Sequence, residues 1–185
     1  MTLLPPLDRG DLTAEHQAVW DEIASYGPVA PKLKIIAHHP DVLREYWRLG
    51  VVLNEQVGLD APTMNLLVMR TSFLDRNAYC WRQRVPKALA VGLSRAKIDS
   101  LANWEISDLF SPSERAMLAY ADAVVGGGEV DDAVVDEMKR YFPSSTLLAI
   151  TILVLYYNLS HRLVDVLDVD PAAGNGDEPL PWEAL

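Results

Sequence analysis

The residues of this chain with the clearest chemical potential lie around its single cysteine. Cys80 is followed by Arg84 four residues later and by Lys87 three residues after that. At helical spacing these three side chains share one face, whereas Arg82 points elsewhere. A thiol beside fixed cations favours its thiolate form, and arginine grips carboxylates in a bidentate manner. The spacing therefore indicates either a reactive cysteine or an anion pocket with a bystander thiol.

Charge is distributed unevenly along the chain. Its 185 residues carry a net charge of −10, yet seven basic residues and one acidic residue lie between Arg70 and Lys97. The segment from Asp168 to Leu185 contributes five acidic residues and no base. Because nucleic-acid affinity comes largely from Lys and Arg on phosphates, the acidic total argues against a DNA or RNA partner. The local basic stretch indicates either a small anionic ligand or a solvated helix face with ion pairs to acidic residues of a neighbouring subunit.

The cysteine and histidine counts limit the possible cofactors. One cysteine excludes an intramolecular disulfide and a zinc site built mainly from cysteine. His38 and His39 are adjacent, so they do not share a helical face as a two-histidine metal site would require. No glycine-rich phosphate loop is present. We expect no metal and no cofactor.

The elements that position these residues are expected to be helices, because capping residues and apolar positions at helical spacing recur along the chain. The expected helices cover residues 13–26, 41–58, 60–74, 77–92, 94–102, 111–126, 131–141 and 145–167. If Asn77 is an N-cap, Cys80 lies at the third helical position, where free amides and the helix dipole favour a thiolate. The sequence predicts an all-α, compact multi-helix domain over residues 1–167. An extended acidic arm is expected over 168–185, and Trp182 is expected to anchor it on this subunit or on a neighbouring one.

The location of the protein is expected to be cytoplasmic. The opening MTLLPPLDRGD has no positive region before an apolar stretch, which argues against a secretory signal. The most apolar run, residues 147–157, is far shorter than the roughly 20 residues that span a bilayer. We therefore expect a buried core helix and no membrane partner.

Four segments in order resemble the carboxymuconolactone decarboxylase and alkyl hydroperoxidase D-like superfamily. They are AHHPDVLREY at 37–46, LLVMR at 66–70, AYCWRQRVPKALAVGLS at 78–94 and YYNLSHRLVDVL at 156–167. The resemblance implies a small all-α protein that forms a homo-oligomer, as a dimer, trimer or hexamer. Five tryptophans and a nearly all-apolar last helix agree with an oligomer, because they suggest more apolar surface than one small domain hides.

Redox-active members of that superfamily carry a glutamate followed by a C-x-x-C-x-x-x-H motif. Carried onto this chain, those positions are Asn65 for the glutamate, Asn77 and Cys80 for the two thiols, and Arg84 for the histidine. Only the second cysteine is kept. A dithiol cycle needs a second thiol, and the proton relay needs a group that titrates near neutral pH, which neither Asn nor Arg does. Dithiol peroxidase activity is therefore disfavoured.

Three hypotheses about function remain open at this point. The first is a cofactor-independent decarboxylase, isomerase or lyase for a small anionic molecule, with Arg84 holding the anion. Its proton-transfer candidates are Cys80, Tyr79 and His39, and its substrate-binding candidates are Asn65, Asn77, Arg70 and Tyr157. The second is a single-cysteine thiol peroxidase, in which Cys80 reduces peroxide and an external thiol resolves it. The third is a non-catalytic binding or assembly module of the same fold.

His161 lies next to two residues that occur in catalytic triads: it follows Ser160 and precedes Asp165 by four residues. A Ser–His–Asp triad is not credible there, since adjacent residues on a helix diverge in direction. A satisfied polar contact is the expected role of this histidine.

Overall fold

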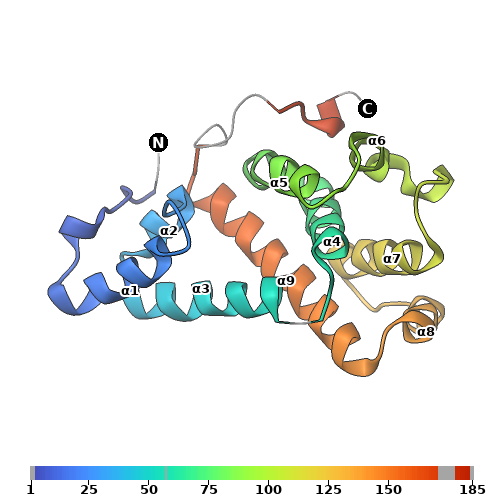
Figure 1. Ribbon diagram of the computed structural model, residues 1–185, viewed down its shortest axis with the longest axis horizontal. Coiled ribbons are helices and arrows are strands. Elements are labelled where there is room, and N and C mark those ends of the chain that lie inside the picture. The colour runs from blue at the N-terminus through green and yellow to red at the C-terminus, as the bar shows by residue number, and fades with distance from the viewer. Residues whose placement is uncertain (1–2, 57, 171–177, 184–185) are drawn as a thin grey trace.

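The protein folds entirely into helices (Figure 1). The computed structural model describes residues 3–56, 58–170 and 178–183, and no strand occurs in these ranges. The α-helices are α1 (Ala14–Ala24), α2 (Pro31–Ile36), α3 (Pro40–Glu55), α4 (Ala61–Leu74), α5 (Ala78–Ala90), α6 (Arg95–Asp99), α7 (Pro112–Gly126), α8 (Asp132–Tyr141) and α9 (Ser144–Val166). Short 3₁₀ helices cover Arg9–Asp11, Ser100–Ile106 and Pro181–Glu183. The predicted all-α fold class is confirmed.

Local capping explains most helix starts. The side chains of Asp60, Asn77 and Asp131 each accept a backbone N–H from the first turn of α4, α5 and α8. Ser111 and Glu114 form the reciprocal capping box expected at the start of α7. These interactions need only neighbouring residues, so the sequence identifies them.

Three predicted boundaries or connections were wrong. α3 begins at Pro40 with His39 as its N-cap, because proline fits the first helical turn and the histidine ring can accept the Val42 N–H. The segment expected as one helix over 94–102 is α6 followed by a 3₁₀ helix, Ser100–Ile106. The short helix α2 was not predicted, since six residues are too few to show helical periodicity.

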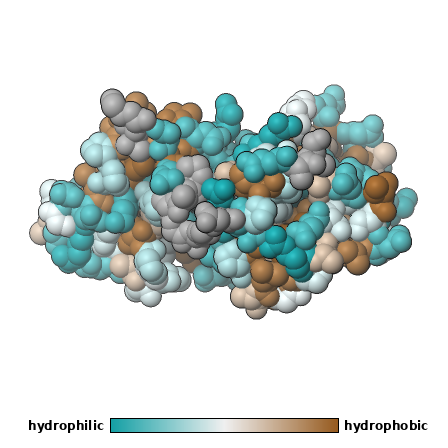
Figure 2. Space-filling view, turned by 90° about the horizontal axis from the view of Figure 1, so that it is seen from above, coloured by the Kyte–Doolittle hydropathy of each residue, from teal (hydrophilic) through white to brown (hydrophobic). Residues whose placement is uncertain are grey.

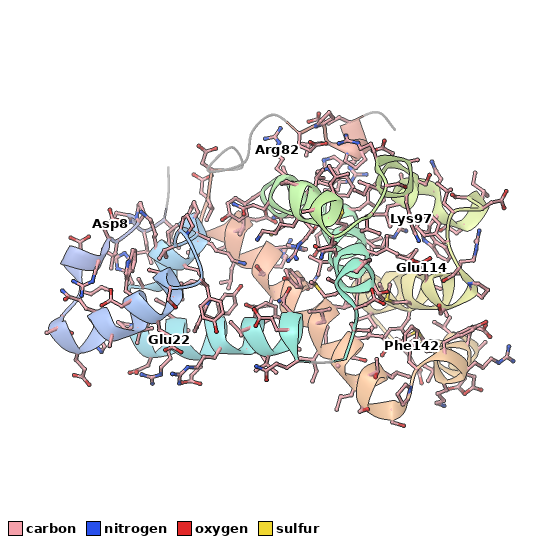
Figure 3. The ribbon with its side chains drawn as sticks, in the orientation of Figure 1. Asp8, Glu22, Arg82, Lys97, Glu114 and Phe142 are labelled. Carbon is pink, nitrogen blue, oxygen red and sulfur yellow. The ribbon has the colours of Figure 1, made fainter. Side chains whose placement is uncertain are left out.

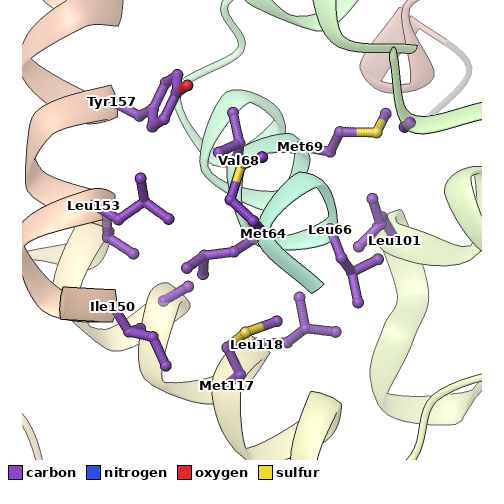
Figure 4. Packing of buried hydrophobic residues seen from close by; sticks show 14 of the residues in the cluster. Met64, Leu66, Val68, Met69, Leu101, Met117, Leu118, Ile150, Leu153 and Tyr157 are labelled. Carbon is purple, nitrogen blue, oxygen red and sulfur yellow. The ribbon is translucent and has the colours of Figure 1, made fainter. Parts of the chain in front are cut away.

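The main core is built around α4, which lies between α5, α7 and α9 (Figure 4). Nine consecutive residues of α4, from Met64 to Ser72, are buried. A helix buried on all sides cannot show the one-sided apolar pattern of a surface helix. Figure 4 shows Ile150, Leu153 and Tyr157 of α9 facing this helix, with Met117 and Leu118 of α7 on another side.

The N-terminal helices form a second, smaller core. Residues of α1, α2 and α3 bury Trp20, Ile23 and Leu43 against one another. A third cluster lies between this unit and the main bundle, and it contains Cys80, Tyr79, Ile35, Val164 and Val169. The single cysteine therefore lies where α2, α5 and the end of α9 meet.

Helix α9 is longer than the apolar run suggested. It has 23 residues and, by length and composition alone, could cross a membrane, so the length argument against a span was wrong. Close to half of its apolar window (44%) is buried inside the protein, where α9 packs against α3, α4, α7 and α8. Gly50 of α3 permits the closest approach, because a Cβ there would lie 2.5 Å from the Tyr156 hydroxyl. These contacts are those of a helix that packs in the protein core.

The last described residues pack over α5 and α6, as the ribbon near the C-terminus shows (Figure 1). The Trp182 ring makes edge contacts with Trp81 and Phe73, so it is anchored on its own chain. Trp81 Nε1 donates to the Pro179 carbonyl at 3.1 Å, and Arg82 Nε donates to the Glu178 carbonyl at 3.2 Å (Figure 3). Residues 171–177, which form most of the expected acidic arm, lie outside the described residues.

Seen from above, this face of the protein mixes hydrophilic and hydrophobic residues (Figure 2). Ion pairs at the periphery include Lys97 with Glu114 at 2.5 Å, two residues that lie close together in Figure 3. These ion pairs lie near the surface of the protein.

Candidate active site

Cys80 lies in the first turn of α5 and is held there by Asn77. The Asn77 Oδ1 accepts the Cys80 backbone N–H at 2.9 Å, as an N-cap does. The amide of Asn77 also donates to Asp165 Oδ1 at 2.9 Å and to the His161 carbonyl at 3.3 Å. Asn77 thereby ties the start of α5 to α9, and the thiol of Cys80 is placed beside the His161 ring.

His161 is fully buried and links Cys80 to a carboxylate. Its Nδ1 lies 2.5 Å from Asp75 Oδ2 and its Nε2 lies 3.2 Å from Ser72 Oγ, and the ring interacts electrostatically with the Cys80 thiol. The Ser72 hydroxyl also bonds to the Val68 carbonyl at 2.9 Å. The Asp75 carboxylate fixes a proton on Nδ1, and the raised pKa of His161 favours the imidazolium.

The ionisation of the thiol agrees with this arrangement. Burial raises the pKa of Cys80, but the hydrogen bond with His161 and the charges of His161, Lys32 and Arg84 outweigh it, so the pKa of the thiol is lowered. Burial lowers the pKa of His161, but its bonds with Asp75 and Cys80 outweigh that effect and raise it. Both pKa shifts favour a thiolate–imidazolium pair backed by Asp75.

Asp75 is itself fixed in place. It caps the C-terminus of α4, and its second oxygen accepts from Asn158 Nδ2 at 2.9 Å. A ring held by a carboxylate on one nitrogen keeps its orientation, which is the positioning that catalytic histidines require. Cys80, His161 and Asp75 thus come from three helical elements, α5, α9 and the end of α4.

Two further cations face the thiol. Arg84 donates to Asn65 Oδ1 at 3.2 Å and to the Tyr157 hydroxyl, and its guanidinium lies 5.1 Å from the Tyr157 ring centroid. Lys32 of α2 donates to Ser160 Oγ at 2.6 Å. Burial lowers the pKa of Lys32, but the acidic groups around it, among them Cys80, raise it overall, so its ammonium stays charged.

A small, partly open cavity lies at the thiol of Cys80. Its volume is about 160 Å³, and it is lined by Ala30, Lys32, Val68, Tyr79, Cys80, Gln83, Arg84, Lys87 and Tyr157. Space of this size admits a small molecule or the end of a larger one. The expectation that Arg84 and Lys87 share a face with Cys80 is confirmed by this lining.

The other candidates from the sequence lie in different places. Tyr79 lines the cavity, and Asn65 and Tyr157 hold Arg84. Arg70 lies outside it, in a buried ion pair with Asp122. His39 caps α3 at the surface, so the structure does not bring it to the thiol.

Sequence reasoning missed the residues that complete the site. The sequence predicts only a satisfied polar contact for His161 and no role for Asp75. Lys32 lies on helix α2, which the sequence does not predict. One usable signal was the presence of a histidine within an almost wholly apolar helix, because a buried imidazole needs polar partners. The position that the family fills with histidine in α5 is Arg84 here, and the imidazole comes from α9 instead.

Metal ligation finds no support in this part of the protein. In residues 3–56, 58–170 and 178–183, no three His, Cys, Asp or Glu side chains are grouped so that they could hold a metal ion. The chemistry considered below uses the thiol, the imidazolium and the cations.

Similar proteins agree with this fold. The chain is 29% identical over 173 residues to the uncharacterized protein YnjA of Escherichia coli (strain K12), which covers 92% of this chain and 94% of that protein. The debrominase Bmp8, solved as a cysteine-to-alanine variant with 2,3,4-tribromopyrrole, matches with a TM-score of 0.78 at 20% identity, covering 99% of this chain and 95% of that one. An alkylhydroperoxidase AhpD core protein from Ralstonia eutropha JMP134 gives a TM-score of 0.77 at 20% identity, covering 96% and 93%.

At these identities the solved structures establish the shared fold. Residues 40–123, which include α3, α4, α5 and Cys80, match the carboxymuconolactone decarboxylase family model. The family match over residues 40–123 and the shared fold agree with the four sequence segments noted above, which resemble the carboxymuconolactone decarboxylase and alkyl hydroperoxidase D-like superfamily.

Proposed function

We propose that this protein is a single-cysteine thiol enzyme that reduces a small electrophile, with a hydroperoxide as the first substrate class. The observation that carries the proposal is the Cys80–His161–Asp75 array beside a cavity of about 160 Å³. An activated thiolate, a positioned acid and a restricted space are the parts that such a reaction needs.

The proposed oxidation step balances with these groups alone. The Cys80 thiolate attacks the terminal peroxide oxygen, an S–O bond forms, and the O–O bond breaks. The departing alkoxide takes a proton from His161, which gives an alcohol and a cysteine sulfenic acid. Arg84 and Lys32 stabilise the thiolate beforehand and offset the negative charge that develops on the leaving oxygen.

The proposed resolution step needs a second thiol from outside, because the chain has one cysteine. An external thiol attacks the sulfenic sulfur, water leaves, and a mixed disulfide forms. A second external thiol then releases the Cys80 thiol and leaves as a disulfide. A cytoplasmic location belongs to the proposal, since reduced thiols are maintained there.

The lyase hypothesis has less support from the site. One of its proton-transfer candidates, His39, lies at the surface as the N-cap of α3, away from the thiol. Turnover of a small carboxylate that survives Cys80→Ser would favour that hypothesis over thiol chemistry. Saturable ligand binding without turnover would favour the binding module.

Debromination is a second candidate, supported by the likeness to Bmp8. The same thiolate could remove bromine from an activated ring, with a proton taking the bromine's place on carbon and external thiol reducing the sulfur–bromine bond to release bromide. 2,3,4-Tribromopyrrole therefore belongs in the substrate panel, and bromide release would measure the reaction.

The decisive test follows oxidation of Cys80 directly. We expect hydrogen peroxide or cumene hydroperoxide to produce a sulfenic acid that dimedone traps as a single adduct in the intact mass. Cys80→Ser should abolish peroxide consumption. His161→Gln should slow it about 100-fold, as expected for loss of a general acid. The exposed His38→Gln serves as the matched control and should keep the wild-type rate. Absence of any adduct in the wild type would overturn the proposal.

We further propose that the protein forms a homo-oligomer through the outer face of α9. Leu148, Ile152, Leu155 and Leu159 are all exposed on that helix at spacings of three or four residues. A contiguous apolar stripe of this kind is unusual on a monomer. Light scattering should give a mass above 20.6 kDa, and Leu155→Glu should reduce it. A wild-type monomer at micromolar concentration would contradict this part.

A further inference from the structure

A larger outer cleft adjoins the cavity at Cys80. This cleft has a volume of about 310 Å³ and lies between α2, α3, α5 and α9. Lys32, Arg84, Lys87 and Tyr157 line both spaces, so these four side chains form the boundary between the outer cleft and the cavity at the thiol. An outer volume of this size is at the lower end of small-molecule sites.

The three shared cations lack carboxylate partners. Lys32 bonds to Ser160, Arg84 bonds to Asn65 and Tyr157, and no acidic group within the described ranges forms an ion pair with Lys32, Arg84 or Lys87. Burial together with the charges of Arg84 and Lys32 lowers the pKa of Lys87, which shows that the cations repel one another. A bound anion would relieve this repulsion.

The inner cavity and the outer cleft differ in the charge of their lining. Tyr79 lines the inner cavity and is only 3% exposed, and its buried hydroxyl lies against the backbone of Lys32. Around the outer cleft, Glu55 is the single carboxylate among the lining residues, against three cations.

We infer that the outer cleft binds the resolving co-substrate, a low-molecular-weight thiol that carries a carboxylate or sulfonate group. The inference rests on the proposed function, in which oxidised Cys80 must be attacked by a thiol from outside. The attacking form is itself a thiolate, so the cations favour both its anionic group and its reacting sulfur. A peroxide needs only the inner cavity, whereas the co-substrate needs room for its charged end.

The test separates resolution from oxidation. Cys80 is oxidised with one equivalent of hydrogen peroxide, which is neutral, and the excess is removed. Mixed-disulfide formation is then timed by intact mass with 2-mercaptoethanesulfonate, 2-mercaptoethanol or cysteamine, which share a two-carbon spacer. Each rate is divided by the rate of the same thiol with a neutral small-molecule disulfide, so that differences in intrinsic reactivity cancel.

We expect the normalised rates to follow the order sulfonate, alcohol, amine, with the sulfonate at least about tenfold faster than the alcohol. Lys87→Glu should remove most of this preference, and added salt should weaken it. Lys139→Glu on α8 makes the same change in net charge far from the cleft, at an exposed lysine paired with Asp136, and should leave the preference intact.

Equal normalised rates for the three thiols would overturn the inference while leaving the proposed function in place. A charge preference seen only in oxidation, with a carboxylated aryl hydroperoxide against its neutral parent, would assign the cations to the substrate and also overturn it. If peroxide fails to oxidise Cys80, the proposed function falls. The inference is then tested on Cys80 labelled with neutral 2,2′-dithiodipyridine, where thiopyridone release reports the same order or refutes it.

Discussion

Two arginines from the same basic stretch, Arg70 and Arg84, have opposite surroundings. Arg70 is 5% exposed and forms a bidentate pair with Asp122 at 2.6 and 2.7 Å, with a third bond to the Leu101 carbonyl. Arg84 meets a side-chain amide, a phenol hydroxyl and an aromatic ring. Asp122 neutralises the charge of Arg70. The partners of Arg84 are neutral, so its positive charge remains available to a molecule in the cavity.

The difference teaches that a run of basic residues has no single meaning. Arg70 belongs to the scaffold, because it joins α4 to α7 and to the 3₁₀ segment Ser100–Ile106, whose Trp104 also donates to Asp122 at 3.1 Å. Arg84 helps to lower the pKa of the Cys80 thiol, because its hydrogen-bond partners are neutral and leave its charge uncompensated. Buried arginines are therefore best sorted by the charge of their partners.

The largest expected effect comes from removing the paired cation. Arg70→Met leaves Asp122 partly buried beside a hydrophobic side chain, and we expect a loss of about 3 kcal/mol in unfolding free energy. Arg84→Met should cost far less, since no carboxylate loses its partner. Urea denaturation of both variants measures the contrast. Equal losses would mean that the two arginines are not different in kind.

The helical frame was predictable because its signals are local. Asp60, Asn77 and Ser111 cap helices through backbone groups two or three residues away, so residue type and spacing suffice. Helix α2 was missed because six residues give less than two turns of pattern, although Pro31 at its start is a usual first-turn residue.

The site was predictable only in part, because only some of its residues are close together in the sequence. Cys80, Arg84 and Lys87 share one helix, so their common face follows from helical periodicity. His161 lies in a different helix far along the chain, and it reaches Cys80 only once α5 packs beside α9. The two arginines likewise look alike in sequence, because Asp122 and Tyr157 are distant partners that tertiary packing alone selects.

A second, smaller effect tests the unpaired cation. Arg84→Met removes a positive charge that helps to lower the pKa of Cys80, so the thiolate fraction should fall in mildly acidic solution. We expect alkylation by iodoacetamide there to slow about fivefold to tenfold. Following the alkylation rate against pH gives the thiol pKa directly. Arg82→Met is a control on the same helix, because Arg82 points to the C-terminal segment and not to the cavity.

The smallest effect is a pH dependence of stability that belongs to the thiolate–imidazolium pair. The pKa of Cys80 is lowered on folding, so its contribution is present above the unfolded value of about 8.5 and is lost as pH falls through its folded pKa. The pKa of His161 is raised, so its contribution is present below about 6.5 and is lost as pH rises through its folded pKa.

Together these two shifts predict a plateau. Stability should rise with pH up to about 6.5, because the folded protein there binds fewer protons at Cys80 than the unfolded chain does. Between about 6.5 and 8.5 the rise that belongs to Cys80 and the decline that belongs to His161 oppose each other, so stability should change little with pH. Any decline above that range belongs to His161, because the contribution of Cys80 is then complete.

The variant Cys80→Ser isolates the pair. It keeps Asp75 and His161 but removes the thiolate, so the rising limb below about pH 6.5 should disappear, with a loss on the plateau of about 1 kcal/mol. Arg84→Met should raise the pH at which the rising limb begins and so shorten it, whereas Arg70→Met should lower the whole curve without changing its shape. Denaturant titrations at several pH values measure all three. A curve for Cys80→Ser that runs parallel to the wild type would show that Cys80 is a neutral thiol in the folded protein.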